Sequence, residues 1–318
     1  MYYIGIDIGG TNIGAGLVDK EGQIISTLAR PTIKDRSAEL ILDDIKDLVK
    51  SLVSKNNLAT EQINSIGIGI PGTIDKKSGV LNYANNLNLD NINIVKEMQK
   101  RLNLPIFVEN DANCAAIGEN IDGSINNNKS IVYITIGTGL GAGIIIDGKL
   151  LNGSFGSGGE AGHMIIAYDG RQCTCGSKGC WEAYASATAL KAAGKEAASK
   201  YKNTKINTLV KGQIGRINAK TVFDASNLGD EIAIEIVNQY IKYLATGLGN
   251  LINIFDPDAI VLGGGVAAQG EKLLKPLKKL LTKNVYGGVL KADIKCAALG
   301  NNAGIVGAAM LYRYNEVK

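Results

Sequence analysis

The chain has 318 residues, of which 45% are apolar, and its formal net charge is +4. This length and composition are enough for about two globular domains, each with its own hydrophobic core. The positive charges are spread along the chain without a basic cluster, which argues against binding to nucleic acid or to an anionic membrane surface.

The N-terminal part opens with strand patterns. We predict antiparallel strands at residues 2–8, 13–18 and 23–28, followed by a helix that starts after Ser37 and has apolar residues at helical spacing. The first strand has no basic signal-peptide region before it, and the longest apolar run, residues 131–146, is too short and too rich in glycine to span a membrane. The sequence therefore predicts a cytoplasmic protein that does not enter the membrane.

A similar pattern occurs twice in the chain. YIGIDIGGTNIGAGLVDKEG near the N-terminus and YITIGTGLGAGIIIDG from Tyr133 each contain a strand, a Gly/Thr turn and a second strand. A tight turn of this kind presents backbone N–H groups to a phosphate. The residues of the two turns are Gly9, Gly10 and Thr11, and Gly137, Thr138 and Gly139. The repeat predicts a duplicated α/β protein on the actin-like ATPase plan, with both turns facing one cleft; chance recurrence among 40 glycines is the alternative.

A polar loop and a short strand precede a candidate catalytic acid. Most of the asparagines in the loop YANNLNLDN are expected to form turns. The predicted strand at residues 105–108 leads into ENDANCAAIGE, at the strand end where open α/β sheets bind ligands. Asp111 lies where this strand gives way to a helix, so its carboxylate is either the helix N-cap or a functional group.

Residues 160–182, EAGHMIIAYDGRQCTCGSKGCWE, contain a candidate metal site. They include the only histidine of the chain, His163, and the cysteines Cys173, Cys175 and Cys180. One imidazole and three thiolates satisfy the tetrahedral coordination of Zn²⁺ and leave no position for water, so we predict a structural site. Free thiols or a disulfide are the alternative.

Two carboxylates, Glu160 and Glu182, bracket the metal ligands. A metal ion that fixes the loop would fix both acids, as recognition of hydroxyl groups requires. The two other cysteines, Cys114 and Cys296, are expected to be buried thiols, and the odd number of cysteines indicates a reducing compartment.

The C-terminal half is predicted to be mainly helical. The pattern gives helices at residues 186–201, 219–225, 230–253, 271–281 and 303–314, and a strand at 259–262. Pro257 ends the long helix. Gly263, Gly264 and Gly265 follow the strand and either let a nucleobase or ribose approach the backbone or simply allow close packing.

Taken together, these motifs resemble the ROK family (repressors, open reading frames and sugar kinases) over essentially the whole chain. The matching motifs are DIGGT (Asp7–Thr11), ENDAN (Glu109–Asn113), IGTGLGAG (Ile136–Gly143), GEAGH (Gly159–His163), CTCGSKGCWE (Cys173–Glu182) and LGGG (Leu262–Gly265). The resemblance implies the two-lobed actin-like fold. We expect a small lobe of residues 1–115, completed by a helix at 302–318, and a large lobe of residues 116–301 that contains the zinc loop.

The resemblance also implies roles for single residues. Asp111 corresponds to the catalytic base. We also expect Asp7 to orient Mg²⁺ through water, with a strand-end turn former as the alternative, and the two Gly/Thr turns and Gly263–Gly265 to contact ATP. The implied zinc ligands are His163 and the three cysteines of the loop. The implied sugar contacts are Asn86, Asn110, Asp111, Glu160, His163 and Glu182, so that His163 binds zinc with one ring nitrogen and faces the sugar with the other.

The chain departs from the family pattern at two places. Gly14 stands where many members have Lys or Arg after the DIGGT turn, which removes a positive charge near the phosphates. The loop that often reads Asn-Leu-x-Trp in the family's glucokinases is Asn86-Leu87-Asn88-Leu89 here, and the missing aromatic ring leaves the sugar preference open.

The expected activity is that of an ATP-dependent hexose kinase, with glucose as the first candidate substrate, and the resemblance favours a homodimer. N-acetylmannosamine, fructose or allose are alternative substrates. A non-catalytic sugar sensor of the repressor type is a further alternative, which the intact Asp111 and both glycine turns oppose. Family repressors carry a DNA-binding domain before the DIGGT strand, whereas here that strand begins at residue 2.

Overall fold

The computed structural model describes residues 1–33, 36–75, 78–83, 87, 89, 91–121 and 129–314. Contacts divide the chain into two compact units. The first unit comprises Met1–Tyr133, Gly143–Gly159 and Ala298–Lys318, and the second comprises Ile134–Ala142 and Glu160–Ala297. The lobe boundary expected after residue 115 falls inside a helix of the first unit that spans Asp111–Ile121.

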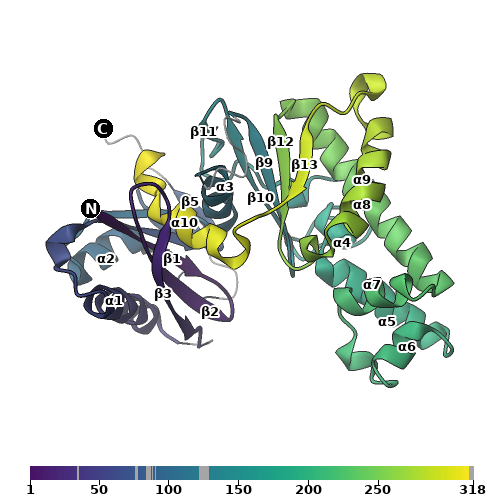
Figure 1. Ribbon diagram of the computed structural model, residues 1–318, viewed down its shortest axis with the longest axis horizontal. Coiled ribbons are helices and arrows are strands. Elements are labelled where there is room, and N and C mark those ends of the chain that lie inside the picture. Colours follow the sequence, from purple (N-terminus) through teal and green to yellow (C-terminus); the bar gives the residue numbers. More distant parts are fainter. Residues whose placement is uncertain are drawn as a thin grey trace. The chain divides into compact units, whose positions relative to one another are not determined.

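The elements follow one another in a mixed α/β order (Figure 1). Up to residue 150 they are β1 (Tyr2–Ile8), β2 (Asn12–Val18), β3 (Ile24–Pro31), α1 (Ala38–Lys55), β4 (Ile63–Ile70), β5 (Thr73–Asp75), β6 (Val80–Tyr83), β7 (Ile92–Asn93), α2 (Ile94–Arg101), β8 (Ile106–Asn110), α3 (Asp111–Ile121), β9 (Ile131–Ile136), β10 (Leu140–Ile146) and β11 (Lys149–Leu150). Then come α4 (Glu182–Ala185), α5 (Ala187–Lys200), α6 (Lys205–Leu209), α7 (Ala219–Asn227), α8 (Glu231–Phe255), β12 (Ala259–Gly263), α9 (Glu271–Asn284), β13 (Asp293–Cys296) and α10 (Ala303–Ala309).

Two five-stranded sheets share one topology. Their strand orders are β3-β2-β1-β4-β8 and β11-β10-β9-β12-β13, so that each sheet consists of three consecutive strands followed by two that are added beside the first. In the first sheet β1 pairs antiparallel with β2 and parallel with β4. The duplicated actin-like fold predicted from the two Gly/Thr hairpins is confirmed.

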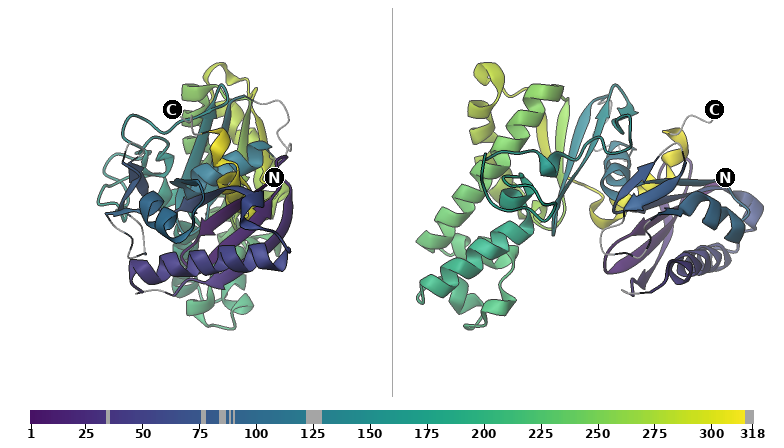
Figure 2. Two further views of the ribbon diagram at one scale, coloured as in Figure 1. Left: turned by 90° about the vertical axis from the view of Figure 1, so that its left-hand side faces the viewer. Right: turned by 180° about the vertical axis from the view of Figure 1, so that it is seen from behind.

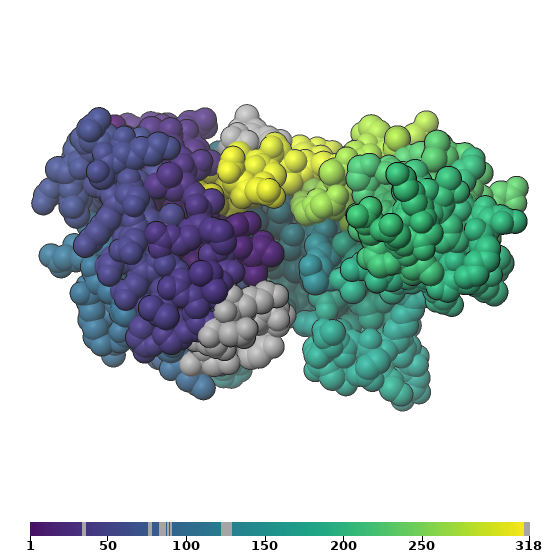
Figure 3. Space-filling view, turned by 90° about the horizontal axis from the view of Figure 1, so that it is seen from below, coloured from purple at the N-terminus to yellow at the C-terminus, as the bar shows by residue number. Residues whose placement is uncertain are grey.

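Helix α10 packs closely on the first sheet because glycines face it. A Cβ atom at Gly5 would lie 1.9 Å from the carbonyl oxygen of Ile305, and one at Gly67 would lie 1.7 Å from that of Ala308. Figures 2 and 3 show the yellow C-terminal residues against the purple N-terminal ones within this unit. The predicted packing is therefore present, although α10 ends at Ala309 and a 3₁₀ turn, Leu311–Arg313, follows it.

The second unit is built around the long helix α8, which packs beside α9 next to strands β12 and β13 (Figure 1). It ends at Phe255, two residues beyond the predicted end, and Asp256 takes a left-handed conformation with φ 42° before Pro257, the residue predicted to stop the helix. The indole of Trp181 is fully buried against Gly247 of α8 and donates a hydrogen bond to the carbonyl of Tyr243 at 2.9 Å. None of the described helices is long and apolar enough to cross a membrane.

Candidate active site and metal cluster

The candidate catalytic acid stands at the junction of β8 and α3. Asn110 caps the helix, because its Oδ1 accepts hydrogen bonds from the N–H groups of Ala112 at 2.9 Å and Asn113 at 3.3 Å. The Nδ2 of Asn110 also donates to the carbonyl of Gly72 at 3.1 Å. Asp111 also contributes at the helix start, because its Oδ1 accepts from the N–H of Ala112 at 2.9 Å, so both its capping role and its catalytic role stay predictions. The sugar contact expected of Asn110 stays a prediction.

Asp7, near the end of β1, is partly buried and lies in the same unit as Asp111. Burial, and after it the negative charge of Asp111, raises the pKa of the Asp7 carboxyl to about 7. The start of α10 contributes to this burial, since a Cβ at Gly304 would lie 2.8 Å from the Asp7 Cγ. A carboxylate held in such a site binds a cation readily, because the cation offsets both the burial and the repulsion.

This burial has a measurable effect on stability. The pKa of the Asp7 carboxyl is 3.8 in the unfolded chain and about 7 in the folded protein. Between these two pH values Asp7 keeps a proton in the folded protein that it has lost in the unfolded chain, so the free energy of unfolding falls as the pH rises. We expect Asp7→Asn, without ligands, to unfold with a free energy about 2–4 kcal/mol higher than wild type at pH 8, and with no gain at pH 3. Urea denaturation at the two pH values measures this difference. Asp47→Asn, which changes an α1 carboxylate that is 51% exposed, is the control, and an equal shift in both variants would contradict the account.

The first phosphate-type turn is closed by hydrogen bonds. The N–H of Gly9 donates to the carbonyl of Asn12 at 2.9 Å. Thr32 supports the turn from outside: its Oγ1 donates to the carbonyl of Gly9 at 2.7 Å and its N–H to that of Thr11 at 2.8 Å. The sequence analysis missed Thr32, since nothing in its local pattern distinguishes it from other strand-end residues.

The second turn has an equivalent closure, with the N–H of Gly137 donating to the carbonyl of Gly139 at 3.0 Å. It is held by the segment after the cysteine loop: Glu182 Oε2 accepts from the N–H of Leu140 at 2.8 Å, and the N–H of Ala187 donates to the carbonyl of Gly137 at 2.9 Å. The role of Glu182 here was not predicted.

Of the three glycines after β12, Gly264 has a packing role. It has φ of 80°, and a Cβ there would lie 2.5 Å from the carbonyl oxygen of Ile136, directly before the second turn. A Cβ at Gly265 would meet no atom within 4 Å, which leaves room for a ligand. Nucleotide contact by Gly263, Gly264 and Gly265 stays a prediction.

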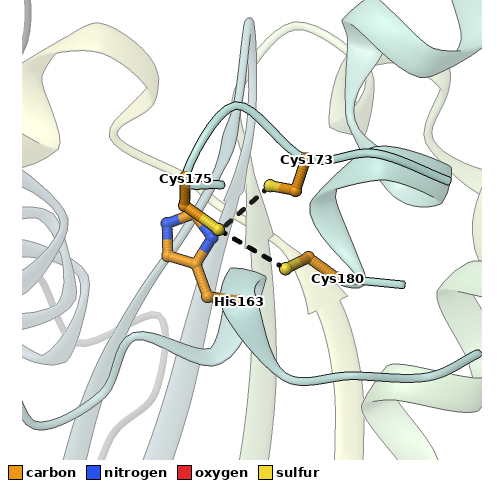
Figure 4. A group of neighbouring side chains, drawn as sticks. All are labelled: His163, Cys173, Cys175 and Cys180. Atoms are coloured by element: carbon orange, nitrogen blue, oxygen red, sulfur yellow. Dashed lines mark hydrogen bonds between the residues drawn. The ribbon is translucent and has the colours of Figure 1, made fainter. Parts of the chain in front are cut away.

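The four predicted metal ligands come together in the second unit (Figure 4). Their ligand atoms all lie within 4.8 Å of one another, with 3.6 Å between the sulfurs of Cys175 and Cys180 and 3.8 Å between Cys173 Sγ and His163 Nδ1. Four N and S ligands around a tetrahedral ion lie about 3.5–3.8 Å apart, given metal distances of about 2.0–2.3 Å. The cluster therefore fits one metal ion.

The thiols of the cluster differ in their surroundings. Cys173 and Cys180 are buried, whereas Cys175 is exposed. A hydrogen bond from the Ser177 backbone is the main cause that lowers the pKa of Cys175 to about 7, while burial raises the pKa of Cys180 to about 12. All five cysteines of the chain are free thiols, so the disulfide alternative is not realised.

The predicted sugar contacts are divided between the units: Asn110 and Asp111 belong to the first, and Glu160, His163 and Glu182 to the second. Asn86 lies outside the described residues. Leu89, where the family pattern has an aromatic residue, is fully buried in the hydrophobic core of the first unit.

A buried acid that the sequence analysis did not consider joins α3 to the segment that precedes α10. Glu119 is fully buried, and its two carboxylate oxygens accept the N–H groups of Ala298 and Leu299, each at 2.9 Å. It lies two turns after Asp111 on α3, so it helps to fix the helix that carries the candidate base.

Comparisons with known proteins agree with this architecture. The ROK family model matches residues 3–315. The glucokinase of Streptomyces coelicolor is 38% identical over 314 residues, which cover 98% of this chain and 97% of that protein. The xylose repressor of Bacillus subtilis is 30% identical over 98% of this chain but only 76% of the repressor.

Among solved structures, the ROK family glucokinase of Streptomyces griseus in complex with glucose and AMPPNP has a TM-score of 0.85 and 37% identity, covering 99% of this chain and all of that one. The similarity thus extends over nearly the whole chain in both sequence and structure. The chain belongs to the ROK family.

Proposed function

We propose that this chain is an ATP-dependent glucokinase, which transfers the γ-phosphoryl group of ATP to the 6-hydroxyl of glucose. The observation that carries the proposal is Asp111, which stands at the junction of β8 and α3, close enough to Asp7 for its charge to raise the pKa of Asp7. Likeness to glucokinases over nearly the whole chain supports glucose as the acceptor.

Phosphoryl transfer needs positioning and charge stabilisation more than covalent chemistry. In the proposed mechanism the Asp111 carboxylate accepts the proton of the sugar hydroxyl as the bond to phosphorus forms. The N–H groups of Gly10, Thr11, Thr138 and Gly139 would hold phosphate oxygens, since those of Gly9 and Gly137 close the two turns themselves. Mg²⁺ would neutralise phosphate charge, with Asp7 as the residue that orients it through water.

The ion that we propose for the cysteine cluster is a structural Zn²⁺. Three thiolates and one imidazole are its preferred ligands, and a full set of four leaves it no catalytic position. With Nδ1 of His163 nearest the thiols, Nε2 is the ring nitrogen that would reach a sugar hydroxyl, together with Glu160 and Glu182.

We further propose a cytoplasmic homodimer whose two compact units are the two lobes of the kinase. Five free thiols and the need for ATP support a reducing, ATP-containing compartment. The dimer rests on the family resemblance alone, and light scattering measures it directly.

A sugar panel tests the choice of substrate. With MgATP and equal concentrations of glucose, N-acetylmannosamine, fructose and allose, we expect the highest kcat/KM for glucose, measured as coupled ADP release. A preference of tenfold or more for another sugar would keep the kinase and change its substrate; absence of turnover with every sugar would favour the sensor alternative.

A further inference from the structure

The second phosphate-type turn and the metal cluster are connected through one carboxylate. Glu182 Oε2 accepts the N–H of Leu140 at 2.8 Å, and a Cβ at Gly139 would lie 2.4 Å from the same oxygen, so the carboxylate lies directly against the turn. Its other oxygen, Oε1, is 3.9 Å from the sulfur of Cys173. One side chain therefore touches both the turn and a member of the metal cluster.

The residues directly before Glu182 are held by contacts with the rest of the second unit. Cys180 belongs to the cluster, and Trp181, directly before Glu182, is fully buried and hydrogen-bonded to the Tyr243 carbonyl. Farther along, the N–H of Ala187 donates to the carbonyl of Gly137 at the other end of the turn. The two ends of the turn are thus held by Glu182 and Ala187, which lie two and seven residues after the last metal ligand, Cys180.

We infer that Glu182 is a positioning residue for the nucleotide: it holds the Gly137–Gly139 turn in the shape that binds phosphate, and it makes that shape depend on the metal cluster. The inference rests on the proposed function, in which this turn contacts ATP, and it adds a second role to the expected sugar contact of Glu182. A turn that is already ordered binds phosphate without an ordering cost, so loss of the support weakens nucleotide binding before any sugar is present.

The negative charge of Glu182 should weaken nucleotide binding, because a carboxylate repels a nearby phosphate, whereas its hydrogen bond to the turn should strengthen binding. Two substitutions separate the effects. Glu182→Ala removes both the charge and the acceptor for the Leu140 N–H, whereas Glu182→Gln removes the charge and keeps an amide oxygen that can accept it. Glu160→Ala is the matched control: Glu160 is also an expected sugar contact in this loop, and within the described part of the chain its carboxylate has no hydrogen bond to the turn.

The experiment is calorimetric titration of each protein with Mg²⁺ and AMPPNP in the absence of sugar. We expect Glu182→Ala to bind about tenfold or more weakly than wild type, Glu182→Gln within about threefold of wild type, and Glu160→Ala unchanged. Wild-type protein stripped of metal by a chelator should lose nucleotide affinity by a factor similar to that of Glu182→Ala. Circular dichroism checks that each sample is folded. Should metal removal unfold the protein, the comparison of Glu182→Gln with Glu182→Ala still tests the inference.

Equal or tighter binding by Glu182→Ala would overturn the inference, as would an equal loss in Glu160→Ala. The same wild-type preparation is assayed for phosphorylation of glucose. If the wild type phosphorylates glucose but Glu182→Ala binds the nucleotide as tightly as wild type, only the inference about Glu182 is overturned. If the wild type does not phosphorylate glucose, the proposed function itself fails.

Discussion

Replacing Asp111 with asparagine should lower kcat by about 10²-fold or more while the dissociation constant of glucose changes by less than about tenfold. A hydroxyl is a poor nucleophile at neutral pH, and the amide cannot accept its proton. The amide keeps the size of the side chain and much of its hydrogen bonding to a sugar. Asn110 caps α3, and an asparagine at position 111 keeps an Oδ1 that can accept the Ala112 N–H, so the helix start should remain intact in this variant.

Turnover by the coupled assay and sugar binding by calorimetry separate the two effects. Asp224→Asn, which changes a carboxylate on α7 paired with Lys220, is the control and should retain wild-type kcat. If Asp111→Asn kept kcat within a few-fold of wild type, the proton would have to go to another acceptor.

The second large effect concerns the metal. Purified protein should contain one zinc ion per chain, and Cys175→Ala should lose it together with about 10²-fold or more in kcat/KM. Cys175 is exposed, so its truncation leaves no cavity in the core, and the loss of activity would come through the ion. Metal analysis by mass spectrometry, in parallel with the kinase assay, measures both quantities.

Cys296→Ala serves as the matched control, because Cys296 donates a hydrogen bond to the Ala267 carbonyl and is not a member of the cluster. This variant should keep its zinc. Full activity of a zinc-free wild-type preparation would show that the cluster is dispensable for the positions of Glu160 and Glu182.

The features that were predicted well from the sequence depend on residues that are close together in the chain. Two Gly/Thr hairpins revealed the duplication, and one histidine with three closely spaced cysteines revealed the cluster, because turn chemistry and ligand type are properties of neighbouring residues. The start of α3 was predicted in place, but the capping role of Asn110 was not, since Asn110 and Asp111 are both good caps and both accept the N–H of Ala112.

The individual hydrogen bonds between residues far apart in the chain were not predicted. Glu182 and Leu140 are 42 residues apart, and Glu119 binds backbone groups that lie 179 and 180 residues later. Gly14 is a related case: the sequence suggested only a missing positive charge, whereas a Cβ there would lie 3.1 Å from the Ile305 Cδ1 of α10. Such partners are set by tertiary packing, which no periodicity in one segment encodes.

The most direct test of the central proposal is product analysis after incubation of the wild-type protein with MgATP and glucose. Phosphorus NMR distinguishes a sugar 6-phosphate from inorganic phosphate and from phosphates at other positions. The account predicts one glucose 6-phosphate formed for each ADP released, with release dependent on glucose. ADP formed with inorganic phosphate instead, or no ADP formed in the presence of glucose, would contradict it.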